Sequence, residues 1–238
     1  MSQSQGDDFL LHQAARDGRV VLAESLLKSN SGLSLKKDND GRLPIHWAVS
    51  SNNLEIVKQL VQLSGFDPDV QDDSGWTPLM IAVNIADSDE IISLLLQKGA
   101  DVNMKNFAGQ SIMHFIASKK KVDLARMFLA LKPPASVRIR DKRGQYPIHR
   151  AASIGSIPMI EALLKAHSPL NASDISGSTA LHHSISEGHG DVAVALLKAG
   201  IDAKRKDSDG NLALDVAPDN EVRKYIIKTA EAEGIDLN

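Results

Sequence analysis

Residues 39–48 read Asn-Asp-Gly-Arg-Leu-Pro-Ile-His-Trp-Ala, and residues 73–82, 34 positions further on, read Asp-Ser-Gly-Trp-Thr-Pro-Leu-Met-Ile-Ala. Both stretches begin with a polar turn sequence and pass into an apolar segment. Their glycine recurs along the chain at intervals of 33 to 35 residues. A fixed period of this length is the signature of a repeat protein, so one short repeat decides the whole fold. The recurring glycines are Gly41, Gly75, Gly109, Gly144, Gly177 and Gly210.

A second residue keeps the same period as the glycine. Counting back 34 residues from His46 gives His12, which has no turn glycine before it. The sequence therefore predicts seven repeats, of which the first and last close the two ends. The positions five residues after the glycines are occupied by His46, Met80, His114, His149, His182 and Asp215.

The residues around the glycine predict a turn followed by a helix. In residues 38–41, Asp-Asn-Asp-Gly, the Asx side chains can bond the nearby backbone and glycine can adopt a positive φ, as at the tip of a hairpin. Thr77 is then a suitable N-cap, and Pro78 suits the first helical position, where its missing N–H costs nothing. Pro44 and Pro147 hold the same position in their repeats.

A second amphipathic helix is predicted later in each repeat. In residues 54–61, Ile56, Val57, Leu60 and Val61 recur at spacings of three and four, which places them on one helix face. One repeat cannot bury this apolar face alone, so stability must come from stacking on neighbouring repeats.

The repeat resembles the ankyrin repeat, a unit of about 33 residues with a Thr-Pro-Leu-His-x-Ala core. The resemblance covers almost the entire chain. It implies an all-α ankyrin-repeat solenoid of seven repeats with short β-hairpin loops, forming a single domain over residues 1–238. The predicted repeats are residues 7–36, 37–70, 71–103, 104–138, 139–171, 172–204 and 205–238.

The composition argues against several classes of function and of chemical site. The formal net charge of -3 argues against a general nucleic-acid binder, which needs a basic excess. The absence of cysteine excludes disulfides, zinc–thiolate sites and thiol catalysis. Residues 1–8 are polar and unlike a signal peptide, and no apolar run approaches the roughly 20 residues that span a bilayer. We expect a cytoplasmic or nuclear monomer that binds neither membrane nor nucleic acid.

The histidines raise the question of a metal or catalytic site. Five of the eight occupy the repeat position, about 8–10 Å apart in stacked helices, which is too far to share a metal bound at about 2 Å. His182, His183, Glu187 and His189 are more suggestive, but His189 falls at the turn between two helices and the spacing is not that of a zinc peptidase. In ankyrin proteins the repeat histidine bonds the neighbouring loop. We predict no metal and no other cofactor.

Enzyme chemistry has no other candidate in the sequence. No serine lies in a nucleophile-elbow sequence, and the periodic glycines are turns rather than a phosphate-binding loop. The sequence therefore predicts a protein-binding module that is not an enzyme.

Partner binding is expected at the hairpin tips and on the exposed side of each first helix. The positions without turn, cap or core duty are the two before the glycine, the one after it, the one after the histidine position and a few near the helix end. Ile81 holds one of them. A surface position has no structural use for tryptophan, and aromatic residues are enriched in binding hot spots. For Phe115 the sequence leaves two alternatives, contact with a partner and packing against neighbouring side chains. The predicted partner-binding residues are Asp40, Arg42, Trp47, Asp73, Trp76, Phe107, Phe115, Lys119, Lys142, Arg143, Arg150 and His183.

These positions also form a charge pattern. Asp40 and Asp73 make the earlier repeats acidic at these positions, whereas the later repeats are basic there, with Lys119, Lys142, Arg143 and Arg150. A partner of complementary polarity would be steered and oriented by this field.

Several stretches carry a more specific resemblance than the general repeat: residues 37–47, 72–78, 137–142, 147–156 and 187–191. They resemble one ankyrin family, gankyrin and its fungal counterparts, which are assembly chaperones of the proteasome regulatory particle. The resemblance implies that the concave face grips the C-terminal domain of one ATPase subunit of the base, shields it from premature docking on the core particle, and is released as assembly completes. An ankyrin adaptor or inhibitor for another partner, such as a kinase or a transcription regulator, is the alternative.

Overall fold

The computed structural model describes residues 9–237. Every regular element within this range is a helix, and extended pairing is limited to two isolated bridges, between Ser173 and Thr179 and between Lys206 and Leu212. The all-α class is therefore confirmed. The chain divides into an N-terminal unit, Met1–Ala108, and a C-terminal unit, Gly109–Asn238. The predicted grouping of all repeats into one domain stays a prediction.

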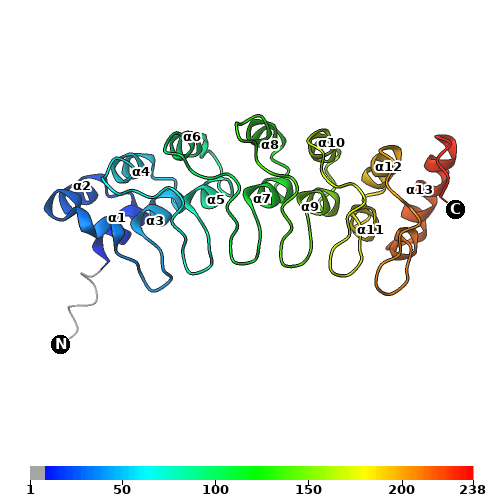
Figure 1. Ribbon diagram of the computed structural model, residues 1–238, viewed down its shortest axis with the longest axis horizontal. Coiled ribbons are helices and arrows are strands. Elements are labelled where there is room, and N and C mark those ends of the chain that lie inside the picture. The colour runs from blue at the N-terminus through cyan, green and yellow to red at the C-terminus, as the bar shows by residue number, and fades with distance from the viewer. Residues whose placement is uncertain (1–8, 238) are drawn as a thin grey trace. The chain divides into compact units, whose positions relative to one another are not determined.

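In the N-terminal unit, first and second helices alternate along the chain and form two layers (Figure 1). In the first layer α3 contacts both α1 and α5, and in the second layer α4 contacts both α2 and α6. The first layer consists of α1 (Leu10–Asp17), α3 (Pro44–Ser50) and α5 (Pro78–Ala82). The second consists of α2 (Val20–Ser29), α4 (Leu54–Leu60) and α6 (Asp89–Gln97), with a 3-10 turn, η1 (Ser31–Leu35), after α2.

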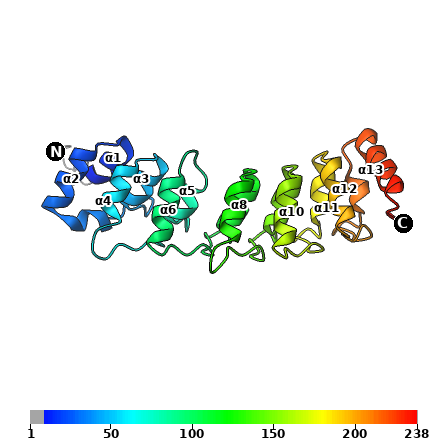
Figure 2. The ribbon, with the colours of Figure 1, turned by 90° about the horizontal axis from the view of Figure 1, so that it is seen from above.

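The C-terminal unit repeats this arrangement. In the first layer α9 contacts α7 and α11, and α11 contacts η2; in the second layer α8, α10, α12 and α13 contact one another in succession. Figure 2 shows α8, α10 and α12 side by side. The first layer consists of α7 (Ile112–Ser118), α9 (Pro147–Ser153), α11 (Ala180–Ser186) and η2 (Ala213–Val216). The second consists of α8 (Val122–Leu129), α10 (Ile157–Lys165), α12 (Gly190–Lys198) and α13 (Asn220–Ala232).

The last predicted repeat departs from the others as expected. Its first helix is reduced to the 3-10 turn η2, which ends before Pro218. Its second helix, α13, turns charged side chains to solvent, whereas Ile226 and Ala230 are buried against α12. An element that is polar outside and apolar inside is suited to closing a stack.

Local chemistry starts the helices where the sequence predicts. Pro44, Pro78 and Pro147 are the first residues of α3, α5 and α9. The Thr77 hydroxyl oxygen accepts a hydrogen bond from the Met80 N–H at 3.2 Å, which satisfies one of the backbone donors left unpaired at a helix start. Both features were predicted and are confirmed.

Small residues allow the first helices to pack closely. Ala48, Ala82 and Ala151 are fully buried on α3, α5 and α9, and Leu, Ile and Val complete the core between the layers. Phe128, on α8, is a fully buried aromatic side chain in a core otherwise built mainly from aliphatic ones. The close packing fixes the distance between neighbouring hairpins, which project beyond the first layer in each unit (Figure 1).

Neighbouring hairpins are tied tip to tip by backbone hydrogen bonds. In the N-terminal unit the Asp73 N–H donates to the Asp40 carbonyl at 3.0 Å, and the Phe107 N–H donates to the Ser74 carbonyl at 3.0 Å. In the C-terminal unit the Ile175 N–H donates to the Arg143 carbonyl at 3.1 Å. The tips therefore present their side chains from a bonded framework rather than from independent loops.

Candidate protein-binding surface

The repeat histidines are structural in the way the sequence predicts. The Nδ1 atom of His46 accepts the Leu43 N–H at 3.0 Å, so the proton lies on Nε2, which contacts the Val70 and Trp76 carbonyls at 3.2 Å. His114 joins the Ser111 N–H to the Gln145 carbonyl in the same manner, at 3.1 Å on both sides. Each imidazole thus bridges the start of its own helix and the next loop.

Burial keeps these imidazoles neutral. It lowers the pKa of His12, His46 and His114. At His149, burial together with the nearby His183 lowers the pKa to about 4. His46, His114 and His149 are hydrogen-bonded on both ring nitrogens, whereas His12 is bonded through Nε2 to the Arg42 carbonyl.

The histidines of the sixth repeat point to three separate partners. His182 Nε2 contacts the Asn211 carbonyl at 3.3 Å, His183 Nε2 contacts Asp174 Oδ2 at 2.9 Å, and His189 Nε2 contacts the Ser153 carbonyl at 3.1 Å. Across residues 9–237, no three His, Asp or Glu side chains are grouped so that they could hold a metal ion.

Three predicted partner-binding residues are held by the hairpin that precedes them. Trp47 Nε1 donates to Asp38 Oδ2 at 2.7 Å, Arg150 donates to Asp141 Oδ2 at 2.9 Å, and His183 contacts Asp174 Oδ2 at 2.9 Å. The expectation that these positions carry no structural duty is therefore wrong. Sequence reasoning missed the bond because its partner lies nine residues earlier, across the turn.

Arg42 and Ile81 show a second departure from that expectation. Arg42 Nε donates to the buried carboxylate of Asp72 at 3.1 Å, across 30 residues of sequence. Ile81, which follows the repeat position of the third repeat, is buried rather than free. Since isoleucine has no donor to offer, the Asp72 carboxylate receives its side-chain partner from the preceding repeat.

Other predicted residues are exposed. Asp40, Asp73 and Phe107 are exposed at the tips of the N-terminal unit, and 55% of the Phe107 surface is accessible. In the C-terminal unit Lys142 and Arg143 are exposed at a tip, and Lys119 is exposed directly after α7. Trp76 and Phe115 are half-buried, so each is in contact with the protein and with solvent.

Ile175 belongs to this surface but was absent from the predicted set. It is 68% exposed, two positions before Gly177, as Phe107 is two positions before Gly109. The periodicity could therefore have identified it. Its side chain is aliphatic, whereas the predicted residues are aromatic or charged.

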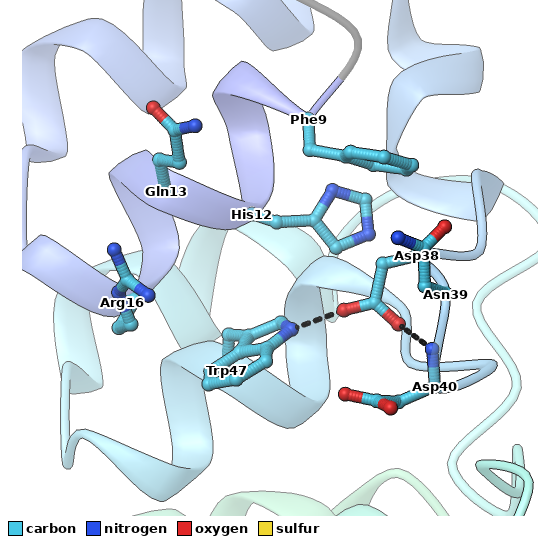
Figure 3. Close-up of a pocket in the computed structure, with 8 residues that line it drawn as sticks. All are labelled: Phe9, His12, Gln13, Arg16, Asp38, Asn39, Asp40 and Trp47. Atoms are coloured by element: carbon cyan, nitrogen blue, oxygen red, sulfur yellow. Dashed lines mark hydrogen bonds between the residues drawn. The ribbon is translucent and has the colours of Figure 1, made fainter. Parts of the chain in front are cut away.

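The N-terminal unit also carries a pocket of about 210 Å³ beside its first hairpin (Figure 3). Phe9 and Trp47 line it together with Asp38 and Asp40. The Arg16 and Arg42 guanidinium groups lie 5.8 and 5.1 Å from the Trp47 ring centroid, within reach of a cation–π contact. Trp47 is thus ordered by a carboxylate on its edge and by cations near its ring.

Comparison with known proteins identifies the repeat. Residues 11–106 and 113–207 match the family described as ankyrin repeats (3 copies). The chain belongs to the ankyrin-repeat family. Ankyrin repeats are protein-interaction modules. The ankyrin domain of human ASB11 superimposes with a TM-score of 0.78 at 20% identity, covering 92% of this chain and 96% of that chain. That of Bcl-3 gives 0.73 at 24% identity, covering 92% and 97%. At this identity the two structures support the ankyrin fold alone.

Two fungal ankyrin-repeat proteins are similar in sequence. Probable 26S proteasome regulatory subunit p28 of Saccharomyces cerevisiae is 37% identical over 159 residues, 66% of this chain and 69% of that protein. Ankyrin repeat-containing protein C6C3.08 of Schizosaccharomyces pombe is 36% identical over 202 residues, 84% and 86% of the two chains. The predicted resemblance to proteasome-associated ankyrin proteins is confirmed.

No helix in residues 9–237 combines the length and apolar character needed to cross a membrane.

Proposed function

We propose that this chain is a non-enzymatic assembly chaperone that binds the C-terminal domain of one ATPase subunit in the base of the proteasome regulatory particle. While bound, it keeps that domain from docking prematurely on the core particle. It acts in the cytoplasm or nucleus as a monomer and needs no metal or cofactor.

The observation that carries this proposal is the 37% identity with probable 26S proteasome regulatory subunit p28. The aligned part is more than half of either chain, so the likeness extends over several repeats rather than one motif. A repeat alone would support binding to some protein. The similarity to a proteasome regulatory subunit supports a partner within the proteasome.

The chemistry of the tips supports a charged partner. Asp40 and Asp73 are exposed on the N-terminal unit, and Lys142 and Arg143 are exposed on the C-terminal unit. Charges of both signs in an interface contribute more to orientation and association rate than to affinity. Phe107 and Ile175 add apolar contact area at neighbouring tips. The partner surface should therefore carry basic, acidic and apolar groups.

The test is a binding panel that uses the full chain and the isolated C-terminal domains of all six base ATPases. We expect one domain to bind clearly more tightly than the other five. The bound chain should also reduce association of that ATPase with core particles. Equal or absent binding across the panel would overturn the proposal. Recovery of a kinase or a transcription regulator without proteasome subunits in an affinity purification would favour the adaptor alternative.

A further inference from the structure

The first acidic residue of a hairpin makes two kinds of hydrogen bond. Asp141 Oδ1 accepts the N–H groups of Arg143 and Gln145, at 2.9 and 2.8 Å, which closes the turn. Its other oxygen, Oδ2, accepts from the Arg150 guanidinium at 2.9 Å. One oxygen of the carboxylate therefore bonds the turn and the other bonds Arg150. The predicted partner-binding residue that is bonded in this way is called the recognition side chain below.

The same division occurs in two other hairpins. Asp38 Oδ1 accepts from the Asp40 and Arg42 N–H groups at 2.9 Å, and Oδ2 accepts from Trp47. Asp174 Oδ1 accepts from the Ser176 and Ser178 N–H groups. Asp174 Oδ2 contacts His183 Nε2 at 2.9 Å and also accepts from Gln145 Nε2 at 3.2 Å. In all three hairpins the side chain on Oδ2 lies nine residues after the aspartate.

Turn formation alone does not require the second oxygen. In the fourth repeat the equivalent residue is Asn106, whose amide oxygen accepts the Ala108 N–H at 3.0 Å. In the last repeat the Oδ2 atom of Asp207 accepts from Asn211 at 3.2 Å, within its own hairpin, and the residue nine positions later is Val216. An amide at this position is thus compatible with the hairpin, and an aspartate can occur without a recognition side chain to hold.

The pairs are sheltered enough to order the side chains. The side chains of Asp141 and Asp174 are 1% and 5% exposed, and those of Arg150 and His183 are 21% and 18% exposed. Burial by itself would raise the pKa of Asp38 and Asp174, but their hydrogen bonds outweigh it and lower the pKa of both, so both carboxylates stay charged. A charged acceptor strengthens each bond.

We propose that Asp38, Asp141 and Asp174 are positioning residues for partner binding. Through its second carboxylate oxygen each one orders the recognition side chain nine residues later before the partner arrives. Ordering a flexible side chain in advance removes an entropy cost from association. This inference rests on the proposed function for the identity of the partner, but not for the geometry.

Asp141→Asn tests it, because the amide oxygen still serves the turn while the second acceptor is lost. We expect about three- to tenfold weaker binding of the ATPase domain, the range that corresponds to one immobilised side chain. In an Arg150→Ala background the same substitution should have no further effect. Asp207→Asn is the matched control and should leave affinity unchanged. An unaltered affinity of Asp141→Asn, or an equal loss in the Arg150→Ala background, would overturn the inference.

A second measurement uses the unbound chain and separates the inference from the proposed function. Asp38→Asn should accelerate solvent exchange of the Trp47 indole N–H, observed by NMR, by about tenfold or more, because a protecting hydrogen bond is lost. Asp207→Asn should not alter it. If no ATPase domain binds the wild-type chain, the proposed function fails, while an unchanged exchange rate in Asp38→Asn rejects the positioning role by itself.

Discussion

The Ile175 N–H donates to the Arg143 carbonyl at 3.1 Å, and this bond brings the hairpin of the sixth repeat directly against Gly144 in the hairpin of the fifth repeat. Gly144 has a φ of 77°, and a Cβ atom there would lie 2.7 Å from the Ile175 nitrogen. The glycine is therefore required both by its own backbone conformation and by the neighbouring hairpin.

Gly144→Ala should lower the free energy of unfolding by about 3 kcal/mol. Left-handed backbone accounts for roughly 1–2 kcal/mol of this, and the contact with Ile175 adds the rest. Gly210→Ala is the matched control, because Gly210 has a φ of 83° but no atom within 4 Å of the added Cβ. Urea denaturation measures both. Equal losses in the two variants would show that the neighbouring hairpin moves away from the added Cβ atom without a measurable cost in stability.

His114→Ala should cost about 2–4 kcal/mol of stability. The substitution removes the acceptor for the Ser111 N–H and the partner of the Gln145 carbonyl, and leaves a cavity between α7 and its neighbours. Lys119→Ala, just after the same helix and exposed, should change stability by less than about 0.5 kcal/mol. A small loss in His114→Ala would mean that water replaces both bonds.

Arg42→Ala should destabilise the chain by about 1–2 kcal/mol, because the buried Asp72 carboxylate loses a charged donor. The exposed Lys58–Glu55 pair, at 2.7 Å, offers a comparison, and Lys58→Ala should cost much less, because solvent screens an exposed ion pair. Urea denaturation of the two variants measures both losses of unfolding free energy. Similar losses would contradict the view that burial of the carboxylate sets the cost.

Stability should fall as the pH is lowered from about 6.5 to about 4. The pKa of His149 is about 4 in the folded chain, against 6.5 when unperturbed, so the unfolded chain binds the proton more tightly. The stability that neutral His149 contributes is fully present above pH 6.5 and is lost as the pH falls. The loss amounts to about 3 kcal/mol by pH 4. Burial shifts the pKa of His12, His46 and His114 in the same direction.

His149→Gln is the variant that checks this assignment. Its unfolding free energy, measured between pH 7 and pH 4, should depend less steeply on pH than that of the wild type. Parallel pH profiles would assign the acid sensitivity to other groups. Asp38 and Asp174 add to the loss only below about pH 4, because their pKa values are lowered.

Reversing Lys142 and Arg143 to glutamate should weaken binding of the ATPase domain and flatten its salt dependence, since exposed charges act through screened attraction. Arg150 is left unchanged, because its guanidinium is paired with Asp141. Reversal of Arg126 and Lys165, exposed in the second-helix layer, is the control for net charge. If both double variants bind alike, the C-terminal tips do not touch the partner.

Much of the fold was predictable because it depends on local chemistry. The prolines of α3, α5 and α9 and the N-cap Thr77 act within one helical turn, and the structure has the helices beginning there. The candidate surface was predicted less well. Positions such as Phe107 are exposed, whereas Ile81 is buried and Ile175 was overlooked. Residue type and period cannot tell how far a first helix is covered by its neighbour.

The sequence by itself determined the repeat, the helix starts, the hairpin turns and the structural role of the histidines, since each depends on residues a few positions apart or on the repeat period. Only the tertiary structure decided what holds the recognition side chains. Trp47 reaches Asp38 because helix α3 folds back against its own hairpin, and Arg42 reaches Asp72 because two hairpins lie side by side. Such bonds depend on the packing of whole helices, which brings together donors and acceptors that no local pattern pairs.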